Sequence, residues 1–228
     1  MENRIYLCGT VHLDLAGPER LRRVLQTLTP KYVAIESYPE LSHEVLEKRK
    51  EFVSYDEKSL LQKIREGSKL PTDGVRTDSA LALLNCVGYE IWVPFEYAEM
   101  SGAQIIHIED KERAQRITKG FLDDIIRDPE KAGPFIEMLK QSPKMLKNIF
   151  DFCYELGVDG DKDEAEVVER NKVFAERIRG LDGRVLAVTG NGHIYGAEPT
   201  LQTLLKEYNP TVFKLIQADY FDSEPQNK

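Results

Sequence analysis

Residues 5–12 read IYLCGTVH, a short apolar run followed by a glycine and, at its end, a histidine. Residues 185–193 repeat this arrangement as VLAVTGNGH. Short, almost unbroken apolar runs are typical of strands covered on both faces of a parallel sheet, which predicts strands at Ile5–Cys8 and Val185–Val188. Ligands of such sheets collect beyond the carboxyl ends of the strands. We therefore expect His12 and His193 to meet at one edge of one sheet.

Three further segments carry the strand pattern, at Tyr32–Ile35, at Ile105–Ile108 and, as a fifth candidate, at Val212–Ile216. Between the first two strands, Pro18–Leu28 has leucine and valine at helical spacing and a proline suited to a helix start. Strand, helix and parallel strand in this order form a right-handed βαβ unit. The sequence therefore predicts an α/β fold with a small, mainly parallel sheet.

The rest of the chain has mostly helical patterns. The predicted helices are Leu41–Tyr55, Glu57–Gly67, Thr77–Met100, Lys111–Arg127, Pro134–Leu156, Glu164–Leu181 and Leu201–Tyr208. The third of these should break or kink near Pro94. Residues 109–184 are too many for one crossover between the third and fourth strands, so we expect a helical insertion at roughly 111–181 that packs over the sheet edge. We predict one domain over residues 1–221 and a disordered tail at 222–228.

Composition limits the classes of function. The chain has 228 residues, 41% of them hydrophobic and 31% charged, and a formal net charge of −8. An acidic chain of this kind is not expected to bind nucleic acid, and no run is apolar enough to predict a membrane span. Without a secretory pattern, and with Cys8, Cys86 and Cys153 each among apolar neighbours, we expect reduced thiols and a cytoplasmic protein. Assembly into a homo-oligomer is compatible with the sequence.

Carboxylates follow two of the predicted strands directly. Glu36 ends the second strand, where a surface charge is badly placed but a metal ligand or a general base is well placed. Its alternative role is to cap a neighbouring helix. Glu109 and Asp110 end the third strand in the same way, and one of them is a candidate to face the site.

Arg170 lies on the apolar stripe of its predicted helix, three residues after Val167 and four before Phe174. An arginine that points inward needs an anionic partner, because an unpaired buried charge is costly. The candidates are a carboxylate at the sheet edge, a bound anion, and negative charge that develops on a substrate. An ion pair with Glu166 on the same helix is the simpler alternative.

The turn Gly190-Asn191-Gly192 precedes the second histidine. Glycine at Gly192 allows a ligand to approach the backbone closely, or presents an N–H group to an anion. The same residues are also compatible with a simple tight turn, because asparagine and glycine tolerate positive φ. The glycines do not have the spacing of a dinucleotide-binding fingerprint.

Taken in order, these elements resemble the TraB/PrgY/TIKI family, relatives of the ChaN and erythromycin-esterase proteins. The matching residues are Gly9-Thr10-Val11-His12, Glu36-Ser37, Phe95-Glu96-Tyr97-Ala98 with Gly102-Ala103, Glu169-Arg170-Asn171 and Gly190-Asn191-Gly192-His193. The resemblance implies a three-layer α/β/α fold with core strand order 2-1-3-4. It also implies that His12, Glu36, Arg170 and His193 meet in one pocket. The chain departs from the family pattern at Leu13-Asp14, at Asn171 and at Glu109-Asp110-Lys111.

The resulting hypothesis is a hydrolase of amide or ester bonds in a peptide or a small molecule. His12, Glu36 and His193 would hold one divalent metal ion, which lowers the pKa of a bound water, and Arg170 would stabilise the oxyanion. We expect substrate contacts at Gly9, Thr10, Asn191 and Gly192. In a metal-free variant, His12 or His193 is oriented by Glu36 and activates water directly.

Two other functions fit the same residues. The pocket could bind haem, a metal ion or a small anion without turnover, so that a tightly bound ligand would leave unchanged. Alternatively, both histidines could be structural. Replacing His12 and His193 by alanine would then lower stability without changing the response to any ligand.

Overall fold

The computed structural model describes residues 4–56, 59, 73–112, 114, 133, 136–156 and 164–221. Most of the predicted helices Glu57–Gly67 and Lys111–Arg127 lies outside the described residues, as does the whole predicted tail at 222–228. Of the predicted helix Pro134–Leu156, only residues 134 and 135 lie outside the described residues, and the structure breaks it at residues 140–142.

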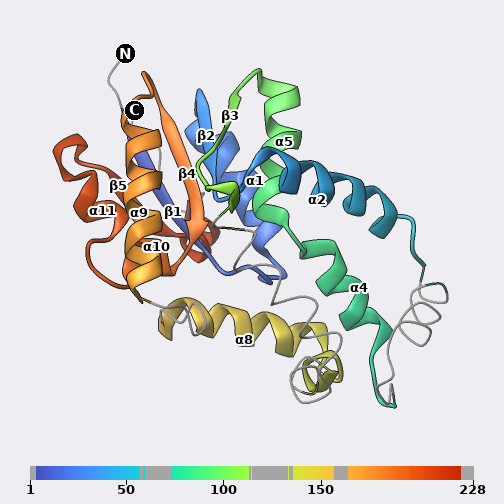
Figure 1. Cartoon of the computed structure of the whole chain (residues 1–228). Helices are drawn as coiled ribbons and strands as arrows, with labels where there is room; N and C mark the ends of the chain where they lie inside the picture. The colour runs from blue at the N-terminus through green and yellow to red at the C-terminus, as the bar shows by residue number, and fades with distance from the viewer. Residues whose placement is uncertain are drawn as a thin grey trace.

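Five parallel strands form one sheet in the order β3-β2-β4-β1-β5 (Figure 1). Their bounds are Ile5–Thr10 for β1, Tyr32–Ile35 for β2, Gln104–His107 for β3, Val185–Gly190 for β4 and Thr211–Lys214 for β5. The predicted α/β class with a parallel sheet is therefore confirmed. The fifth candidate strand is present, but the chain leaves it at Lys214 for a 3-10 helix.

The expected strand order 2-1-3-4 is wrong. β4 lies between β1 and β2, whereas that order places β1 beside β2 and puts β4 at an edge. Burial explains the difference. All six residues of β4 are buried, as a central strand requires, while β3 is at most partly buried and forms an edge. The connection from β1 to β2 therefore crosses over the position of β4, which lies between these two strands in the sheet.

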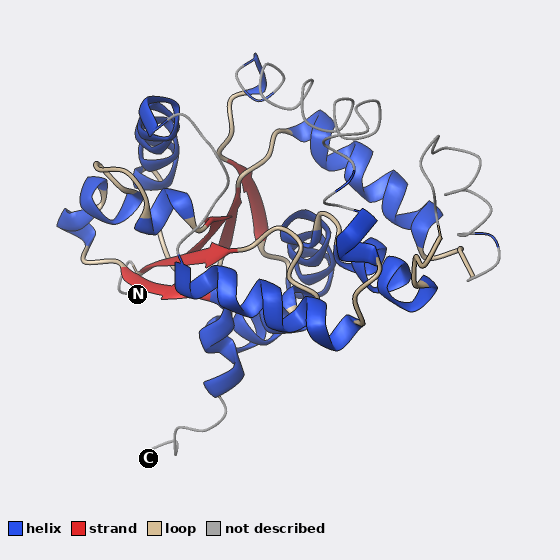
Figure 2. Cartoon of the chain, turned by 90° about the horizontal axis from the view of Figure 1, so that it is seen from below, coloured by secondary structure: helices blue, strands red, loops and turns tan. Residues whose placement is uncertain are grey.

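Helices cover both faces of the sheet (Figure 2). Their bounds are Gly17–Leu28 for α1, Pro39–Phe52 for α2, Thr77–Cys86 for α4, Tyr89–Ser101 for α5, Pro143–Leu156 for α8, Glu164–Arg179 for α9, Gly192–Tyr195 for α10 and Leu201–Leu204 for α11, with 3-10 helices η1 at Lys206–Tyr208 and η2 at Leu215–Tyr220. Side chains of α1, α5 and η2 pack on one face, and those of α9, α10 and α11 pack on the other. The result is the three-layer arrangement.

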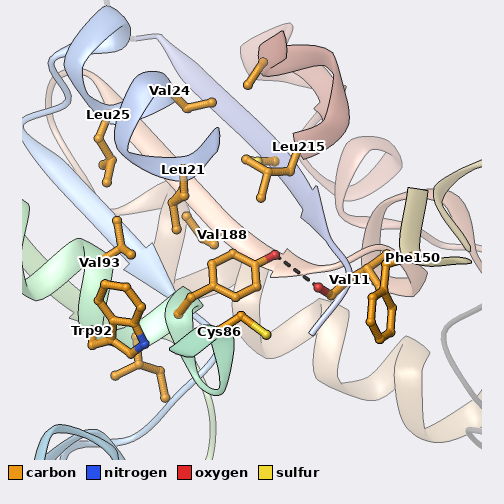
Figure 3. Close-up of a cluster of buried hydrophobic side chains, with 14 of the residues drawn as sticks. Val11, Leu21, Val24, Leu25, Cys86, Trp92, Val93, Phe150, Val188 and Leu215 are labelled. Carbon is orange, nitrogen blue, oxygen red and sulfur yellow. Dashed lines mark hydrogen bonds between the residues drawn. The ribbon is translucent and has the colours of Figure 1, made fainter. Parts of the chain in front are cut away.

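Successive side chains of a strand point to opposite faces of the sheet, so the interior is divided into two cores, one on each face. In β4, Leu186 and Val188 face the core under α1 and α5, while Val185 and Ala187 face the core under α9. Figure 3 shows part of the first core, where Leu21, Val24 and Leu25 from α1 pack near Val188. Because both faces of the central strand β4 are buried, its sequence lacks a polar face.

The predicted break near Pro94 is wrong, because α5 continues through this residue. The chain breaks earlier, at Gly88, which has a φ of 65° that favours glycine. Pro94 lies early in the helix that follows, and its missing N–H leaves only the carbonyl of Glu90 without its helical donor. Burial of Trp92, Val93 and Pro94 in the core compensates for that lost hydrogen bond.

α8 lies beyond the carboxyl ends of the strands (Figure 1). Across residues 4–221, as far as they are described, no helix is both long enough and apolar enough to cross a membrane.

Candidate functional site

A polar cluster occupies the carboxyl edge of the sheet between β2 and β4. Glu36 is the first residue after β2, and its backbone N–H donates to the carbonyl of Val188 at 3.3 Å. Its side chain bends toward β4, where Oε2 accepts the N–H of Gly190 at 2.8 Å. With 11% of its side chain exposed, Glu36 is held at the edge by the backbone of the neighbouring strand.

Arg170 reaches this edge from α9 with only 7% of its side chain exposed. Its Nε donates to Oε2 of Glu109 at 2.9 Å, and its Nη2 contacts both Glu109 and Glu36. One guanidinium thus joins the residues that follow β2 and β3. The partners of Arg170 are two carboxylates of the sheet edge, and not Glu166 of its own helix.

The charge of Arg170 is maintained despite burial. Burial alone would lower the pKa of this guanidinium, but the adjacent carboxylates of Glu36 and Glu109 outweigh it, and the pKa is raised. The guanidinium also lies 5.4 Å from the ring centroid of Phe174. Among the described residues, Nη1 of Arg170 has no acceptor, so this nitrogen keeps its two donors for another group.

His193 is fully buried beside the same carboxylate. Its Nδ1 lies 2.7 Å from Oδ1 of Asn171, whose Nδ2 donates to the carbonyl of Pro199 at 3.1 Å. Because the Pro199 carbonyl can only accept, it fixes the amide orientation, and His193 must donate from Nδ1. Nε2 of His193 lies 3.2 Å from Oε1 of Glu36, which is also an acceptor.

Arg170 bridges Glu36 and Glu109, and the ring of His193 lies against the same carboxylate of Glu36. The positive charge of Arg170 thus lies against both carboxylates, Glu36 and Glu109. A buried group of charges is stabilised by such pairing, since each unpaired member would keep its full desolvation cost.

His12 lies on the same edge but has a different partner. Its Nδ1 is 2.9 Å from Oε1 of Glu90 on α5, and 55% of its side chain is exposed, against 12% for Glu90. Since β4 separates β1 from β2, the ends of these strands are about 10 Å apart, two strand spacings. The expectation that Glu36 ends the strand next to that of His12 is therefore wrong. In the neutral ring, the contact with Glu90 places the proton on Nδ1 and the lone pair on Nε2.

The residues predicted to contact substrate are packed tightly. Thr10 is fully buried, and its hydroxyl donates to the carbonyl of Thr189 at 3.1 Å. A Cβ on Gly9 would lie 2.6 Å from Oδ1 of Asn191, so only glycine allows this approach. Asn191 is fully buried, and neither polar atom of its side chain has a partner in the described structure. Gly192 begins the short helix α10, which carries His193.

The predicted metal ligands do not form one set. Glu36 and His193 contact each other, whereas His12 contacts Glu90. In the described part of the chain, no group of three or more His, Cys, Asp or Glu side chains is arranged to hold a metal ion. The donor set described here therefore does not fit a three-ligand centre. The metal site stays a prediction that elemental analysis can check.

A second buried network, which was not among the predictions from the sequence, supports the loop that carries His12. Arg20 of α1 is 2% exposed and donates to Asp14 at 2.8 Å, to Asp151 at 2.8 Å and to Asp219 at 2.6 Å. Burial alone would lower the pKa of the Arg20 guanidinium. Hydrogen bonds with Asp219 and the charge of Asp14 outweigh burial, so the pKa is raised. A signal was present, because Arg20 lies four residues before Val24 on the buried side of α1.

Two buried tyrosines connect this network to the first strand end. The hydroxyl of Tyr154 donates to Asp14 at 3.0 Å and accepts the N–H of Val11 at 3.3 Å. The hydroxyl of Tyr89 donates to the carbonyl of Val11 at 3.1 Å. Both backbone groups of the residue before His12 are thus held by side chains of α8 and α5. Residues from three helices determine where His12 leaves the sheet.

The fold and the cluster define an α/β protein with a charged, hydrogen-bonded site at the carboxyl edge of a parallel sheet. No family model, no curated protein and no solved structure matches the chain. The resemblance to the TraB/PrgY/TIKI family therefore rests on the sequence motifs alone.

Proposed function

We propose that the protein is a hydrolase of amide or ester bonds in a peptide or a small molecule, as the resemblance to the TraB/PrgY/TIKI family implies. Its substrate lies across the carboxyl ends of β2, β4 and β1. The observation that carries the proposal is Arg170, a buried arginine that two carboxylates hold in place while Nη1 has no acceptor among the described residues. A preorganised donor of this kind stabilises an oxyanion without reorganising during the reaction.

His12 is the general base in this proposal. Glu90 orients the ring through Nδ1, and Nε2 of the neutral ring takes a proton from the attacking water. The proton then goes to the leaving group, and the acyl carbon keeps the hydroxyl oxygen. The orienting role predicted for Glu36 is thereby assigned to Glu90.

Glu36 and His193 act as positioning residues. Glu36 accepts hydrogen bonds from Gly190 and Arg170 and lies 3.2 Å from Nε2 of His193, so its oxygens are engaged within the cluster. Together they fix the guanidinium of Arg170 with Nη1 directed away from the carboxylates. The loss of either residue would weaken oxyanion stabilisation through the displacement of Arg170.

Binding of a small anion without turnover is the second candidate function. The same unused donor of Arg170 supports it, because a guanidinium nitrogen binds a carboxylate or phosphate oxygen as well as an oxyanion. The two functions differ in whether the ligand is changed.

The experiment measures hydrolysis of a panel of p-nitrophenyl esters and fluorogenic peptide amides by the purified protein. The substitution His12→Ala should reduce kcat/KM by roughly a hundred-fold or more, the usual contribution of a general base. His43→Ala removes an exposed histidine of α2 and serves as the matched control, with kcat/KM unchanged. Equal turnover by both variants, or no turnover of any substrate by the wild type, contradicts the proposal.

Exhaustive chelation separates the two variants of the mechanism. The metal-free reaction keeps its full kcat/KM after chelation and dialysis. A loss of activity that Zn²⁺ or Mn²⁺ restores would instead support the predicted metal at His12, Glu36 and His193. Elemental analysis of the wild type and of the double variant His12→Ala/His193→Ala then shows whether these residues bind it.

A further inference from the structure

α8 has an apolar face that does not contribute to the core. Four of its large apolar side chains are exposed: Met145 by 50%, Ile149 by 37%, Phe152 by 54% and Leu156 by 57%. Their spacing of four, three and four residues places them on one stripe of the helix. The residues that α8 contributes to the core, Leu146, Phe150 and Tyr154, lie on a different side. Contiguous apolar stripes on a protein surface usually mark a contact with another molecule.

The stripe is symmetric about the middle of the helix. Reversing the direction of α8 exchanges Met145 with Leu156, and Ile149 with Phe152, so that the same pattern results. A second copy turned end over end therefore meets the first with apolar side chains opposite apolar side chains. An isologous interface with two-fold symmetry requires this kind of self-complementary surface.

The charges beside the stripe favour the same orientation. Lys144 and Glu155 are exposed on one flank of the stripe, and neither forms an ion pair with another described residue. In an antiparallel pair of helices, Lys144 of one copy lies within a turn of Glu155 of the other, twice by symmetry. A parallel two-fold pair would place the two charged flanks on opposite sides of the interface, where Lys144 and Glu155 could not pair, and would also align the two helix dipoles unfavourably.

We propose that α8 forms the interface of a homodimer, in which two copies pack antiparallel through Met145, Ile149, Phe152 and Leu156. α8 lies beyond the carboxyl edge of the sheet (Figure 1), so the interface is at the end of the molecule that carries the site. A single helix stripe is small compared with the standard interface of about 800 Å² per partner, so the dimer dissociates on dilution.

Sedimentation velocity over a wide concentration range tests the interface. The wild type should shift from the mass of one chain to that of two as its concentration rises. The double variant Ile149→Glu/Phe152→Glu should remain a monomer, with an unchanged circular dichroism spectrum. Met100→Glu changes an apolar side chain that is 77% exposed elsewhere, and it should dimerise like the wild type. A wild type that stays monomeric, or a double variant that still dimerises, overturns the proposal.

Charge reversal tests the orientation. Lys144→Glu places two glutamates together at each end of the antiparallel interface and should raise the dissociation constant roughly ten-fold. Adding Glu155→Lys to the same chain restores both ion pairs and should recover the wild-type constant. A dissociation constant that is unchanged in the single variant, or that the double variant fails to recover, overturns the antiparallel arrangement.

Discussion

Asn171 accepts a hydrogen bond from Nδ1 of His193 at 2.7 Å, and this contact determines how the buried ring is used. With Nδ1 occupied, the ring can reach Glu36 only through Nε2. His193 therefore links α9 to the end of β2 through two hydrogen bonds, and it has no exposed nitrogen. This geometry assigns His193 to support of the site, while the exposed His12 is the histidine that can meet a substrate.

Replacing Asn171 by leucine should leave Nδ1 of His193 and the carbonyl of Pro199 without their partner. We expect a loss of about 1–3 kcal/mol in the free energy of unfolding, because a buried donor left unsatisfied keeps its desolvation cost. Urea unfolding measures this loss. Lys172→Ala is the matched control on the same helix, where an exposed ion pair with Glu169 should be worth less than about 1 kcal/mol. Equal losses in the two variants would contradict the assigned hydrogen bonds.

Removal of the charge of Arg170 should be more costly. The variant Arg170→Met leaves Glu36 and Glu109 as a pair of buried carboxylates with no bridging cation. We expect about 3–5 kcal/mol of destabilisation, which is typical when one partner of a buried ion pair is removed. Adding Glu109→Gln to this variant removes one repelling charge and should recover part of the loss. A destabilisation by Arg170→Met below about 1 kcal/mol would show that the three residues do not form a buried network.

The thiols should differ in reactivity. Burial raises the pKa of Cys86 to about 12, and it raises that of Cys8 far above the ordinary value of a thiol. Both groups remain protonated in the folded protein, and thiolates are the reactive form. Cys153, which is only partly buried, should react first with a maleimide at mildly alkaline pH. Mass spectrometry of the labelled chain checks this, and early labelling of Cys86 would disprove it.

The two raised thiol pKa values also set the direction of a pH effect on stability. In the unfolded chain the thiols ionise near their ordinary pKa of 9.0, but in the folded chain they do not. The unfolded state therefore gains stability as the pH rises above about 9. Urea midpoints should fall between pH 9 and pH 11, and Cys86→Ala should reduce this slope. A slope that is the same in the variant would show that Cys86 does not contribute.

Asp14 and Asp219 both contact Arg20, but their removal should differ in cost. Asp14 is fully buried and also holds Tyr154, so Asp14→Ala should cost about 3 kcal/mol. The side chain of Asp219 is 40% exposed, so Asp219→Ala should cost about 1 kcal/mol or less. A hydrogen bond from Arg20 lowers the pKa of Asp219, so its contribution is present at neutral pH and is lost as the pH falls below the ordinary carboxyl range. Equal costs at neutral pH would contradict this ranking.

The local features of the fold could be predicted from the sequence, because a buried parallel strand has a recognisable apolar run. This holds for β1, β2 and β4, whose cores match the predicted segments within two residues. The inward direction of Arg170 could also be predicted from its place on the apolar stripe of α9. These features depend on neighbours within one turn of helix or one strand.

Features that depend on distant parts of the chain could not be predicted in this way. Strand order depends on which strands pair, and the central place of β4 follows from burial on both faces and both edges. The contact of His12 with Glu90 joins residues 78 positions apart, and that of Arg20 with Asp219 joins residues 199 positions apart. No spacing rule connects such residues before the fold brings them together.

The central claim is that Arg170 presents its unused Nη1 to a substrate, and kcat/KM of Arg170→Lys tests it most directly. Lysine keeps the charge near Glu36 and Glu109 but cannot hold both carboxylates and also supply a free donor. Using the best ester or peptide of the panel, we predict a loss of roughly a hundred-fold in kcat/KM, typical of a missing oxyanion donor. Lys172→Arg on the same helix should keep the wild-type value. A folded Arg170→Lys variant with the wild-type kcat/KM would contradict the account.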